Sequence, residues 1–508
     1  MRYLIIISLF LIVKLPAFSQ GAFHLKHTVP YDNEVFDIAE CEKGYLLVGN
    51  SSPTTPVSNG YLLFLNHNGD IVWEKIIPAY LPDNYEQYRS VVYHDGYFYI
   101  GGFSDMNDDR FSILTKIDMQ GNISYKKKIG SENIYAYDNL LNNLLVNGEG
   151  ILVATSGFNG TGTAGELVQV DFEGNILWNN KFFNYIHTSN SYWEYFEDMK
   201  KGKDGNFILT LLSNANNLDF PCKSLIKVNP DGEEIWRKTF DTLKPSALTE
   251  DSMLYFMTAA PFKENHVLAY FAVDTFPKVD YRTDIALIEY DEYGNEINYK
   301  RFYNSNGFGN TNIYTNKDNE IFISGTRHYE DSLRLTIIKF SADKEIEWIK
   351  SHYKEPDSTI VNALWINVGE FFKCGIPTSD NGFLMTGGNL YMIANDHYWN
   401  STIIKTDCEG NTTWDYSRCS SPEFEDITIF PNPSSDNFII QLPDLQEKDK
   451  IQIAVYDVMG KLVQLSEHSA KGVITLNSSI WAEGTYICRI TVNNEVVKTE
   501  KLLKIDGM

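Results

Sequence analysis

The sequence predicts an all-β protein, in which a seven-bladed β-propeller is followed by a small C-terminal β-sandwich. Three observations lead to this prediction. One hairpin motif occurs seven times, at spacings of 50 to 66 residues. A short apolar strand precedes each copy, and the last eighty or so residues change to a different pattern of short strands. Seven units of about 57 residues need about 400 residues, which residues 20–420 supply.

Each hairpin motif reads as a strand, a tight turn and a second strand that opens on a large aromatic residue. The turn residues are Gly69, Gly121, Gly174, Gly232, Gly294, Lys344 and Gly410, and the residues four places later are Trp73, Tyr125, Trp178, Trp236, Asn298, Trp348 and Trp414. An Asp or Asn three places before the turn residue in six copies can bond the backbone ahead of it, and glycine accepts positive φ. Because one hairpin cannot bury a large ring by itself, we expect a neighbouring copy to cover it.

Two more strands precede each hairpin. The nearer one is apolar, as in residues 44–49 and 96–101, and an irregular strand such as Val35–Ile38 or Phe196–Met199 lies ahead of it. Four short strands per unit describe a propeller blade. Two segments have the pattern of the outer strand that closes the ring, Phe23–Val29 and Thr412–Ser417, and the sequence does not choose between them.

The N-terminus and the charge define where the protein acts. Residues 1–19 form a signal peptide, with a positive start, an apolar run from Leu4 to Val13 and a small-residue cleavage site at Ala17-Phe18-Ser19. No later apolar run is long enough to cross a bilayer, so we expect an exported soluble chain that begins at Gln20. The net charge of −24 argues against nucleic acids and anionic membranes as partners.

The six cysteines are Cys41, Cys222, Cys374, Cys408, Cys419 and Cys488. An exported protein can oxidise them, but six cysteines allow fifteen pairings. Cys408 and Cys419 flank the last hairpin, so these two and Cys374 are the candidates for a bridge, while the others are expected to be small buried residues. Their spacing has no zinc pattern, and we expect no metal or cofactor.

The composition shifts at residues 421–426, which have the character of a linker, and residues 427–508 alternate in short strands. Four motifs follow in order: Phe430-Pro431-Asn432-Pro433, Val455–Lys461 with Gly460, Gly484-Thr485-Tyr486, and Lys501–Lys504. Together they resemble the type A C-terminal sorting domain of the Bacteroidetes type IX secretion system. Trp481 stands where that family usually has leucine.

The resemblance implies an export route. The signal peptide would take the chain to the periplasm, and an outer-membrane translocon would recognise the folded tail. A sortase-like peptidase would then remove the tail, so that the protein is released or joined to the cell surface. The residues that carry the resemblance are Pro431, Asn432, Pro433, Gly460, Gly484, Tyr486 and Lys501. Proline and glycine at turns and tyrosine in a core would mainly hold the fold, and the fold would be the signal.

The hairpin motif resembles the propeller repeats of quinoprotein-like and outer-membrane assembly-factor proteins, which carry Asp-x-x-x-Gly-x-x-x-Trp. The Asp is one residue closer to the glycine in this chain, and the resemblance covers the hairpins but not the loops. We take the fold from it and no activity, because propellers host unrelated functions.

Three function classes remain open. No histidine pair has metalloprotease spacing, and no nucleophile elbow or phosphate loop occurs, so no catalytic residue is named. A carboxylate pair for glycoside hydrolysis or a lyase stays an alternative. The main hypothesis is a scaffold that binds an extracellular glycan or protein through aromatic loop residues, and a structural spacer is the third. The candidate ligand residues are His187, Tyr192, Trp193, His397, Tyr398 and Trp399.

Overall fold

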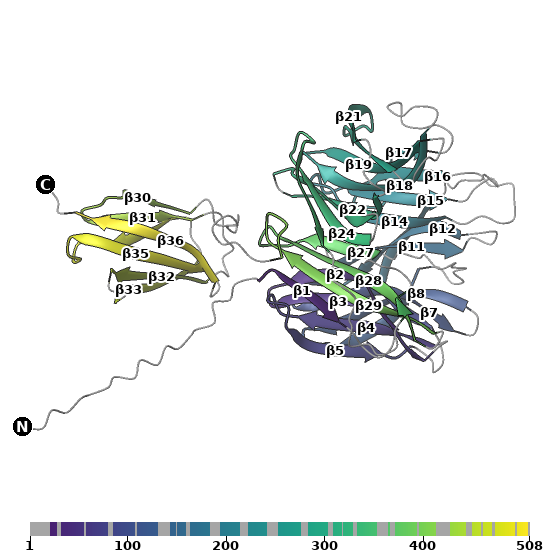
Figure 1. Cartoon of the computed structure of the whole chain (residues 1–508), viewed down its shortest axis with the longest axis horizontal. Helices are drawn as coiled ribbons and strands as arrows, with labels where there is room; N and C mark the ends of the chain where they lie inside the picture. The colour runs from purple at the N-terminus through teal and green to yellow at the C-terminus, as the bar shows by residue number, and fades with distance from the viewer. Residues whose placement is uncertain are drawn as a thin grey trace, which may run out of the picture. The chain divides into compact units, whose positions relative to one another are not determined.

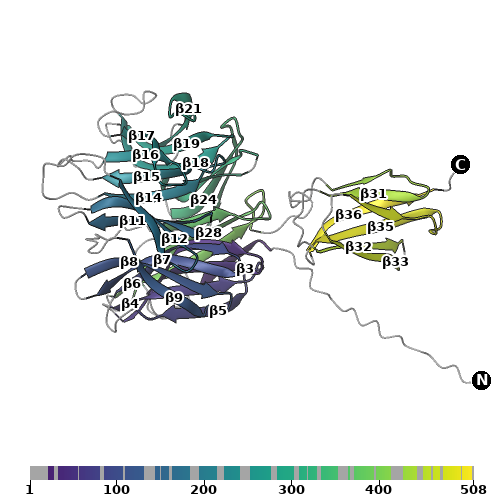
Figure 2. The same ribbon diagram turned by 180° about the vertical axis from the view of Figure 1, so that it is seen from behind.

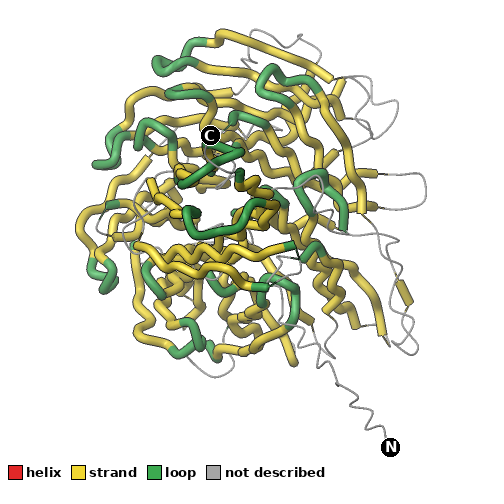
Figure 3. The backbone as a smooth tube through the Cα atoms, turned by 90° about the vertical axis from the view of Figure 1, so that its left-hand side faces the viewer, coloured by secondary structure: helices red, strands yellow, loops and turns green. Residues whose placement is uncertain are grey.

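The computed structural model describes residues 21–27, 32–54, 57–79, 85–106, 109–130, 143–148, 150–158, 163–182, 194–213, 222–240, 252–275, 283–302, 308–316, 318–328, 333–352, 364–365, 371–393, 396–412, 427–442, 450–458, 461–469, 473–492 and 495–505. Within these residues every regular element is a strand, as Figure 3 shows by colour. The all-β prediction is therefore confirmed. The chain divides into two compact units, one with β1 to β29 and the other with β30 to β36.

The first unit contains seven antiparallel sheets within its described residues (Figures 1 and 2). Six have four consecutive strands each: β2 (Asp32–Cys41), β3 (Gly44–Thr54), β4 (Val57–Leu65) and β5 (Ile71–Ile77); β6 (Glu86–His94), β7 (Tyr97–Met106), β8 (Asp109–Asp118) and β9 (Ile123–Ile129); β10 (Asn143–Asn147), β11 (Gly150–Phe158), β12 (Thr163–Asp171) and β13 (Ile176–Phe182); β14 (Glu194–Lys201), β15 (Phe207–Ser213), β16 (Cys222–Val228) and β17 (Glu234–Phe240); β18 (Ser252–Phe262), β19 (His266–Thr275), β20 (Thr283–Tyr290) and β21 (Glu296–Phe302); β22 (Phe308–Thr315), β23 (Ile321–His328), β24 (Leu333–Phe340) and β25 (Ile346–His352). The seventh combines β26 (Leu364–Trp365), β27 (Phe371–Pro377), β28 (Phe383–Ile393), β29 (Asp396–Thr406) and β1 (Phe23–His27).

The first strand of each four-stranded sheet packs against the first strand of the next, and β27 takes this place in the seventh sheet. These contacts run from β2 through β6, β10, β14, β18 and β22 to β27, and β27 in turn contacts β2. Apolar clusters fill the spaces between consecutive sheets, as between the first two, where Phe64 meets Phe98. We call the middle of this succession of first strands the axis.

The turns of the hairpin motif have the geometry that the sequence predicts. In the second copy the Asp118 carboxylate accepts hydrogen bonds from the backbone N–H groups of Gln120 and Asn122, at 2.9 and 2.8 Å. Gly121 has a φ of 71°, in the region that favours glycine. Lys344 replaces glycine in the sixth copy and still adopts a φ of 62°.

A neighbouring copy does cover the aromatic ring, as expected. Each ring lies against the turn glycine of the next sheet, in the pairs Trp73 with Gly121, Tyr125 with Gly174, Trp178 with Gly232, Trp236 with Gly294 and Trp348 with Gly410. A Cβ atom on Gly232 would come within 2.5 Å of the Trp178 ring, so only glycine leaves room for it. The indole N–H of Trp236 also donates to the carbonyl of Glu292 in the next turn, at 2.9 Å. We call this arrangement the ring–glycine clasp.

The N-terminal strand supplies the ring of the seventh sheet. β1 pairs with β29, and Phe23 is opposite Lys405, the register position that Trp178 has opposite Gln169 in the third sheet. Figure 1 shows this purple strand beside the green strands of the seventh sheet. In the sequence repeat this position corresponds to Trp414, and in the structure Phe23 lies opposite Lys405. Trp414 itself lies outside the described residues.

The cysteines follow the predictions in part. Cys408 forms a disulfide, whereas Cys41, Cys374 and Cys488 are free and buried. Cys374 is therefore excluded as the partner of Cys408. Cys419 lies outside the described residues, so its bridge to Cys408 stays a prediction.

The second unit is a two-sheet sandwich in its described residues. One sheet has β30 (Thr428–Phe430), β31 (Asn437–Gln441) and β34 (Val473–Asn477), and the other has β33 (Leu462–Ser469), β32 (Lys450–Asp457), β35 (Gly484–Val492) and β36 (Glu495–Lys504). The core between them includes Phe438, Trp481 and Tyr486, with Trp481 stacked on Phe438. The replacement of leucine by Trp481 is therefore accommodated inside the core.

Two of the tail motifs form one structural feature. The Asn432 side chain donates to the carbonyl of Lys501 at 2.7 Å and accepts from the N–H of Leu503 at 2.9 Å. Ser434 continues the pairing along β36 through backbone bonds to Leu503 and Ile505. Tyr486 donates to the carbonyl of Ala482 at 2.8 Å, and Gly484 has a φ of 149°. These motif residues hold the fold, whereas Gly460 lies outside the described residues.

Candidate functional site

The predicted ligand residues form two groups, and the structure describes only the backbone of the second group. Because the strands are antiparallel, the connection into a first strand and that between second and third strands lie at the same end, opposite the turns of the hairpin motif. His187, Tyr192 and Trp193 precede β14 and lie outside the described residues. The backbones of His397, Tyr398 and Trp399 belong to β29 and pair with Met392, Tyr391 and Leu390 of β28. The two groups remain a prediction.

The first strands bring a second set of polar residues together near the axis. We call Asp37 of β2, Asp198 and Lys200 of β14, and Asn312 and Tyr314 of β22 the axial cluster. Asp37, Asp198 and Asn312 each follow a register shift in their strand pairing, which turns one side chain out of the regular alternation.

Hydrogen bonds join these residues across sheets. The Lys200 ammonium contacts the Asp198 carboxylate at 2.9 Å and the Asn312 amide oxygen at 3.1 Å. It also lies 4.5 Å from the centre of the Tyr314 ring. Asn312 in turn donates to the Tyr314 hydroxyl at 2.9 Å. The fourth and sixth sheets are therefore linked past the fifth, which places these groups in the space that the first strands enclose.

The carboxylates of the axial cluster have different environments. Burial raises the pKa of Asp37 to about 6, although Val91 donates its N–H to the carboxylate at 2.8 Å and the charge of Lys200 acts in the opposite sense. Asp198 has a direct ion pair with Lys200 and accepts a further bond from Thr258 at 2.9 Å. Burial, together with the charges of Asp198 and Asp37, holds the pKa of Tyr314 well above its usual value. One acid can thus exchange a proton near neutrality beside a paired carboxylate.

The cluster keeps some access to solvent. The side chains of Asp198 and Lys200 are 14% and 16% exposed, and Asp37 and Tyr314 are also only partly buried. A polar group that is enclosed by protein and yet partly accessible can meet a ligand. The arrangement can donate and accept hydrogen bonds and can transfer a proton.

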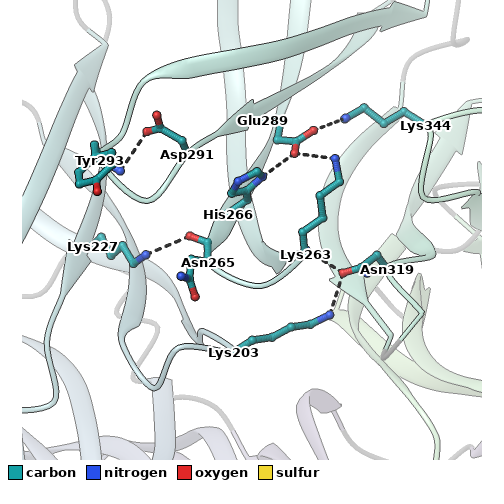
Figure 4. Close-up of polar contacts among 10 residues, drawn as sticks. All are labelled: Lys203, Lys227, Lys263, Asn265, His266, Glu289, Asp291, Tyr293, Asn319 and Lys344. Carbon is teal, nitrogen blue, oxygen red and sulfur yellow. Dashed lines mark hydrogen bonds and ion pairs between the residues drawn. The ribbon is translucent and has the colours of Figure 1, made fainter.

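A second polar network lies at the other end, among the turns of the fourth to sixth sheets (Figure 4). Glu289 has a side chain that is 1% exposed, and it contacts Lys344 at 2.6 Å, His266 at 2.7 Å and Lys263 at 2.9 Å. Burial opposes its ionisation, but the hydrogen bonds from Lys344, Lys263 and His266 outweigh it and lower the pKa of Glu289 to about 2.

This network replaces a ring–glycine clasp. The fifth copy has Asn298 in place of the aromatic residue, and the sixth has Lys344 in place of the glycine that such a ring would cover. Lys344 instead reaches back to Glu289, which lies opposite Asn298 in the strand register. The Glu289 network is therefore a structural joint between these two sheets.

Sequence reasoning missed both polar sets, although signals for some of their members exist. Asp37 is an acidic residue between Phe36 and Ile38 in a first strand, and Asp198 directly precedes Met199 in another. Glu289 occupies a repeat position where four other copies have lysine, namely Lys116, Lys227, Lys339 and Lys405. Tyr314 and Lys200 carry no such signal, because nothing local indicates that they meet across two sheets.

Two searches of the described residues are negative. They contain no group of three or more His, Cys, Asp or Glu side chains that could hold a metal ion. They also contain no helix with the length and apolar character needed to cross a membrane.

Comparison with known proteins identifies the tail. The family model of a secretion system C-terminal sorting domain matches residues 428–505. A curated relative, an endo-acting ulvan lyase of Formosa agariphila, is 30% identical over 78 residues, which are 15% of this chain and 14% of the relative. The chain therefore matches about a seventh of that relative's length.

Solved structures weakly resemble large parts of the chain. An ulvan lyase of polysaccharide lyase family PL25 has a TM-score of 0.47 at 9% identity, over 78% of this chain and 98% of the other. A fungal alcohol oxidase of the AA5 family, in complex with copper, has a TM-score of 0.44 at 12% identity, over 95% and 99%.

The sorting-domain match agrees with the motifs read from the sequence and with the sandwich that they stabilise. The chain is therefore handled by the type IX secretion machinery, which exports it to the cell surface or into the medium.

Proposed function

We propose that residues 20–420 form a closed seven-bladed β-propeller, joined by a linker at residues 421–426 to the sorting domain at residues 427–508, with residues 1–19 as a signal peptide. The succession of seven sheets, the contact of β27 with β2 and the pairing of β1 with β29 support this organisation. The N-terminal strand then closes the propeller, as an outer strand of its last blade.

The propeller binds an extracellular glycan at the end of the axis opposite the hairpin turns. The observation that carries this proposal is the axial cluster, which gathers hydrogen-bond donors and acceptors in an enclosed but partly accessible place. The candidate ligand residues remain His187, Tyr192, Trp193, His397, Tyr398 and Trp399, because aromatic faces beside amides suit sugar rings. A protein ligand is the other outcome of the same test.

A glycan-cleaving enzyme is the second candidate, favoured by the unequal carboxylates. Asp37 can carry a proton near neutrality, while Asp198 is paired with Lys200, and such a difference suits an acid and a base. The curated relative named as an ulvan lyase gives this candidate a reaction class to test. Asp37 and Asp198 are the residues that would carry it.

A glycan array probed with the mature full-length chain tests the binding proposal. The proposal is supported if the chain binds one class of glycan on the array and Asp198→Asn does not. It is contradicted if the chain binds no glycan and retains only proteins from an extracellular matrix extract. The same glycans, incubated with the chain and examined for new reducing ends or unsaturated uronates, separate binding from cleavage. Cleavage that Asp37→Asn and Asp198→Asn both abolish favours the enzyme.

At the tail, we propose that the sortase-like peptidase of the secretion machinery cuts between the propeller and the sorting domain. Mass spectrometry of the exported protein tests this. A C-terminus that precedes Ile427 is expected, and an intact Lys501 in the exported form contradicts the proposal.

A further inference from the structure

We propose that the axial cluster is a subsite for the neutral, hydroxyl-bearing end of a glycan chain, which enters along the axis end-on. This inference rests on the proposed function, because it gives the bound glycan a position and a class. It is carried by three features of the described residues: the hydrogen-bonding capacity of the cluster, its charge, and the bonds that cross the axis beneath it.

The hydrogen-bonding capacity fits a hydroxyl group. The Tyr314 oxygen accepts from Asn312, which leaves the hydroxyl hydrogen of Tyr314 to donate to a ligand. Asp37 accepts hydrogen bonds from the N–H groups of Val91 and Ile38 and from the Ser90 hydroxyl. A carboxylate has about four acceptor positions, so one remains for a ligand. A sugar hydroxyl is both donor and acceptor, so one hydroxyl can donate to Asp37 and accept from Tyr314.

The charge of the cluster disfavours an acidic sugar. The charged and titratable groups that face Asp37 are Lys200, Tyr314 and Cys374, and Asp198 lies beside Lys200. Two carboxylates therefore share one ammonium, which is already bonded to Asp198. A uronate or sulfate would add a further negative charge to this site in a chain of net charge −24.

Bonds across the axis give the direction of entry. Lys200 of β14 bonds to Asn312 of β22, and Lys203, in the turn after β14, bonds to Asn319, in the turn after β22, at 2.7 Å. Figure 4 shows the second bond, with the N–H of Lys263 also donating to Asn319. Both bonds link the fourth sheet to the sixth, and the second lies at the end of the axis where the hairpin turns are. They leave less room for a ligand at that end. A ligand therefore approaches from the other end, and only the end of a chain can reach Tyr314.

Saturation-transfer NMR with the mature full-length chain tests the inference. The probes are galactose, glucose and xylose, with galacturonate and glucuronate as matched acidic sugars. We expect a neutral sugar to bind, and its uronate to bind at least tenfold more weakly. Loss of one hydrogen bond in Tyr314→Phe or Asp37→Asn should weaken binding about tenfold. Tyr93→Phe, which removes a hydroxyl bonded to Glu42 outside the cluster, should bind as the unchanged chain does.

Thermal unfolding shows whether each variant folds. If one of Tyr314→Phe and Asp37→Asn does not fold, the other still tests the inference. Binding of the neutral sugar should strengthen from pH 5 to pH 7, because ionised Asp37 is the better acceptor. Equal binding of sugar and uronate overturns the inference, as does wild-type binding by both cluster variants. So does the failure of every neutral sugar to bind while long glycans bind on the array, and the proposed function then stands alone. If no glycan of any length binds, both the inference and the proposed function are wrong.

Discussion

The ring of Phe23 lies against Gly69, so closely that a Cβ atom on the glycine would be 2.6 Å from the ring. Phe23 comes from the N-terminal strand and is paired in the seventh sheet, whereas Gly69 belongs to the first. The contact repeats the ring–glycine clasp of the other sheets at the junction between the seventh sheet and the first. The clasp is therefore a device for joining consecutive sheets, and it does not depend on which part of the chain supplies the ring.

Removal of the Phe23 ring should destabilise the first unit. We expect Phe23→Ala to lower the free energy of unfolding by about 2 kcal/mol, less than a fully buried phenylalanine because Phe23 is half-buried. Phe23→Trp, which installs the ring found in most other copies, should cost less. Urea denaturation of both variants checks this, and equal losses for the two would contradict the account.

Two glycines have the same backbone conformation, so a comparison of their alanine variants separates the cost of backbone strain from the cost of steric contact with a ring. Gly205 and Gly232 have φ values of 81° and 79°, but a Cβ atom would meet nothing within 4 Å at Gly205 and the Trp178 ring at Gly232. Gly205→Ala should cost about 1–2 kcal/mol of strain, and Gly232→Ala about 1–3 kcal/mol more. Similar unfolding free energies for the two variants would show that the ring does not hold the turn.

The Glu289 network should behave as a buried ion pair. We expect Glu289→Gln to destabilise the protein by about 3–5 kcal/mol, because Lys344 is 2% exposed and would lose its carboxylate. Glu264→Gln, an exposed change in the neighbouring turn, is the control. The pair Asn298→Trp with Lys344→Gly should recover part of the loss in the Glu289→Gln background, since it restores a ring–glycine clasp. No recovery would mean that the network and the clasp are not equivalent.

The same residue gives an acid dependence. The pKa of Glu289 falls from 4.5 to about 2 on folding, so its stabilising contribution is present above pH 4.5 and is lost as the pH falls toward 2. The difference in unfolding free energy between the wild-type chain and Glu289→Gln should therefore be smaller at pH 2.5 than at pH 5. A gap that is equally wide at both values would contradict the depressed pKa.

Asp37 should have the opposite dependence. Its pKa rises from 3.8 to about 6 on folding, so the folded state binds a proton that the unfolded state has lost, and stability falls as the pH rises through 6. Asp37→Asn keeps an acceptor for Val91 and should be more stable than the wild-type chain at pH 7, by about 1–3 kcal/mol. Measured stability curves from pH 4 to pH 8 check it, and a variant that is less stable throughout would contradict it.

Asn432 should matter for the tail and for export. Asn432→Ala removes two hydrogen bonds to β36, at an expected cost of about 1–3 kcal/mol. The sequence predicts that the fold of the tail is the export signal, and on that prediction the variant should accumulate in the periplasm. Ser435→Ala, at a half-buried position close by, is the control. Immunoblots of periplasm and medium measure the ratio, and normal export of a destabilised tail would contradict the link.

The sequence predicted what is local and repeated. The Asx turns, the alternating strands and the need to cover each ring follow from residues a few places apart, and Asp118 and Gly121 behave as expected. The pairing of Phe23 with Lys405 could not be chosen, because two segments had the same pattern and only closure distinguishes them. The axial cluster was missed for a related reason, since Lys200 and Asn312 are 112 residues apart and meet through the arrangement of whole sheets.

Ring closure is the claim from which the shared axis and its cluster follow. A cysteine pair at Leu25 and Ile403, which are opposite each other in β1 and β29, tests it in the mature full-length chain. Oxidation should link the two tryptic peptides in mass spectra, whereas a pair at Leu25 and Ile77 should not link. If Leu25→Cys and Ile403→Cys stay unlinked in the folded protein, the N-terminal strand does not close the ring, and the axial cluster loses its enclosing wall.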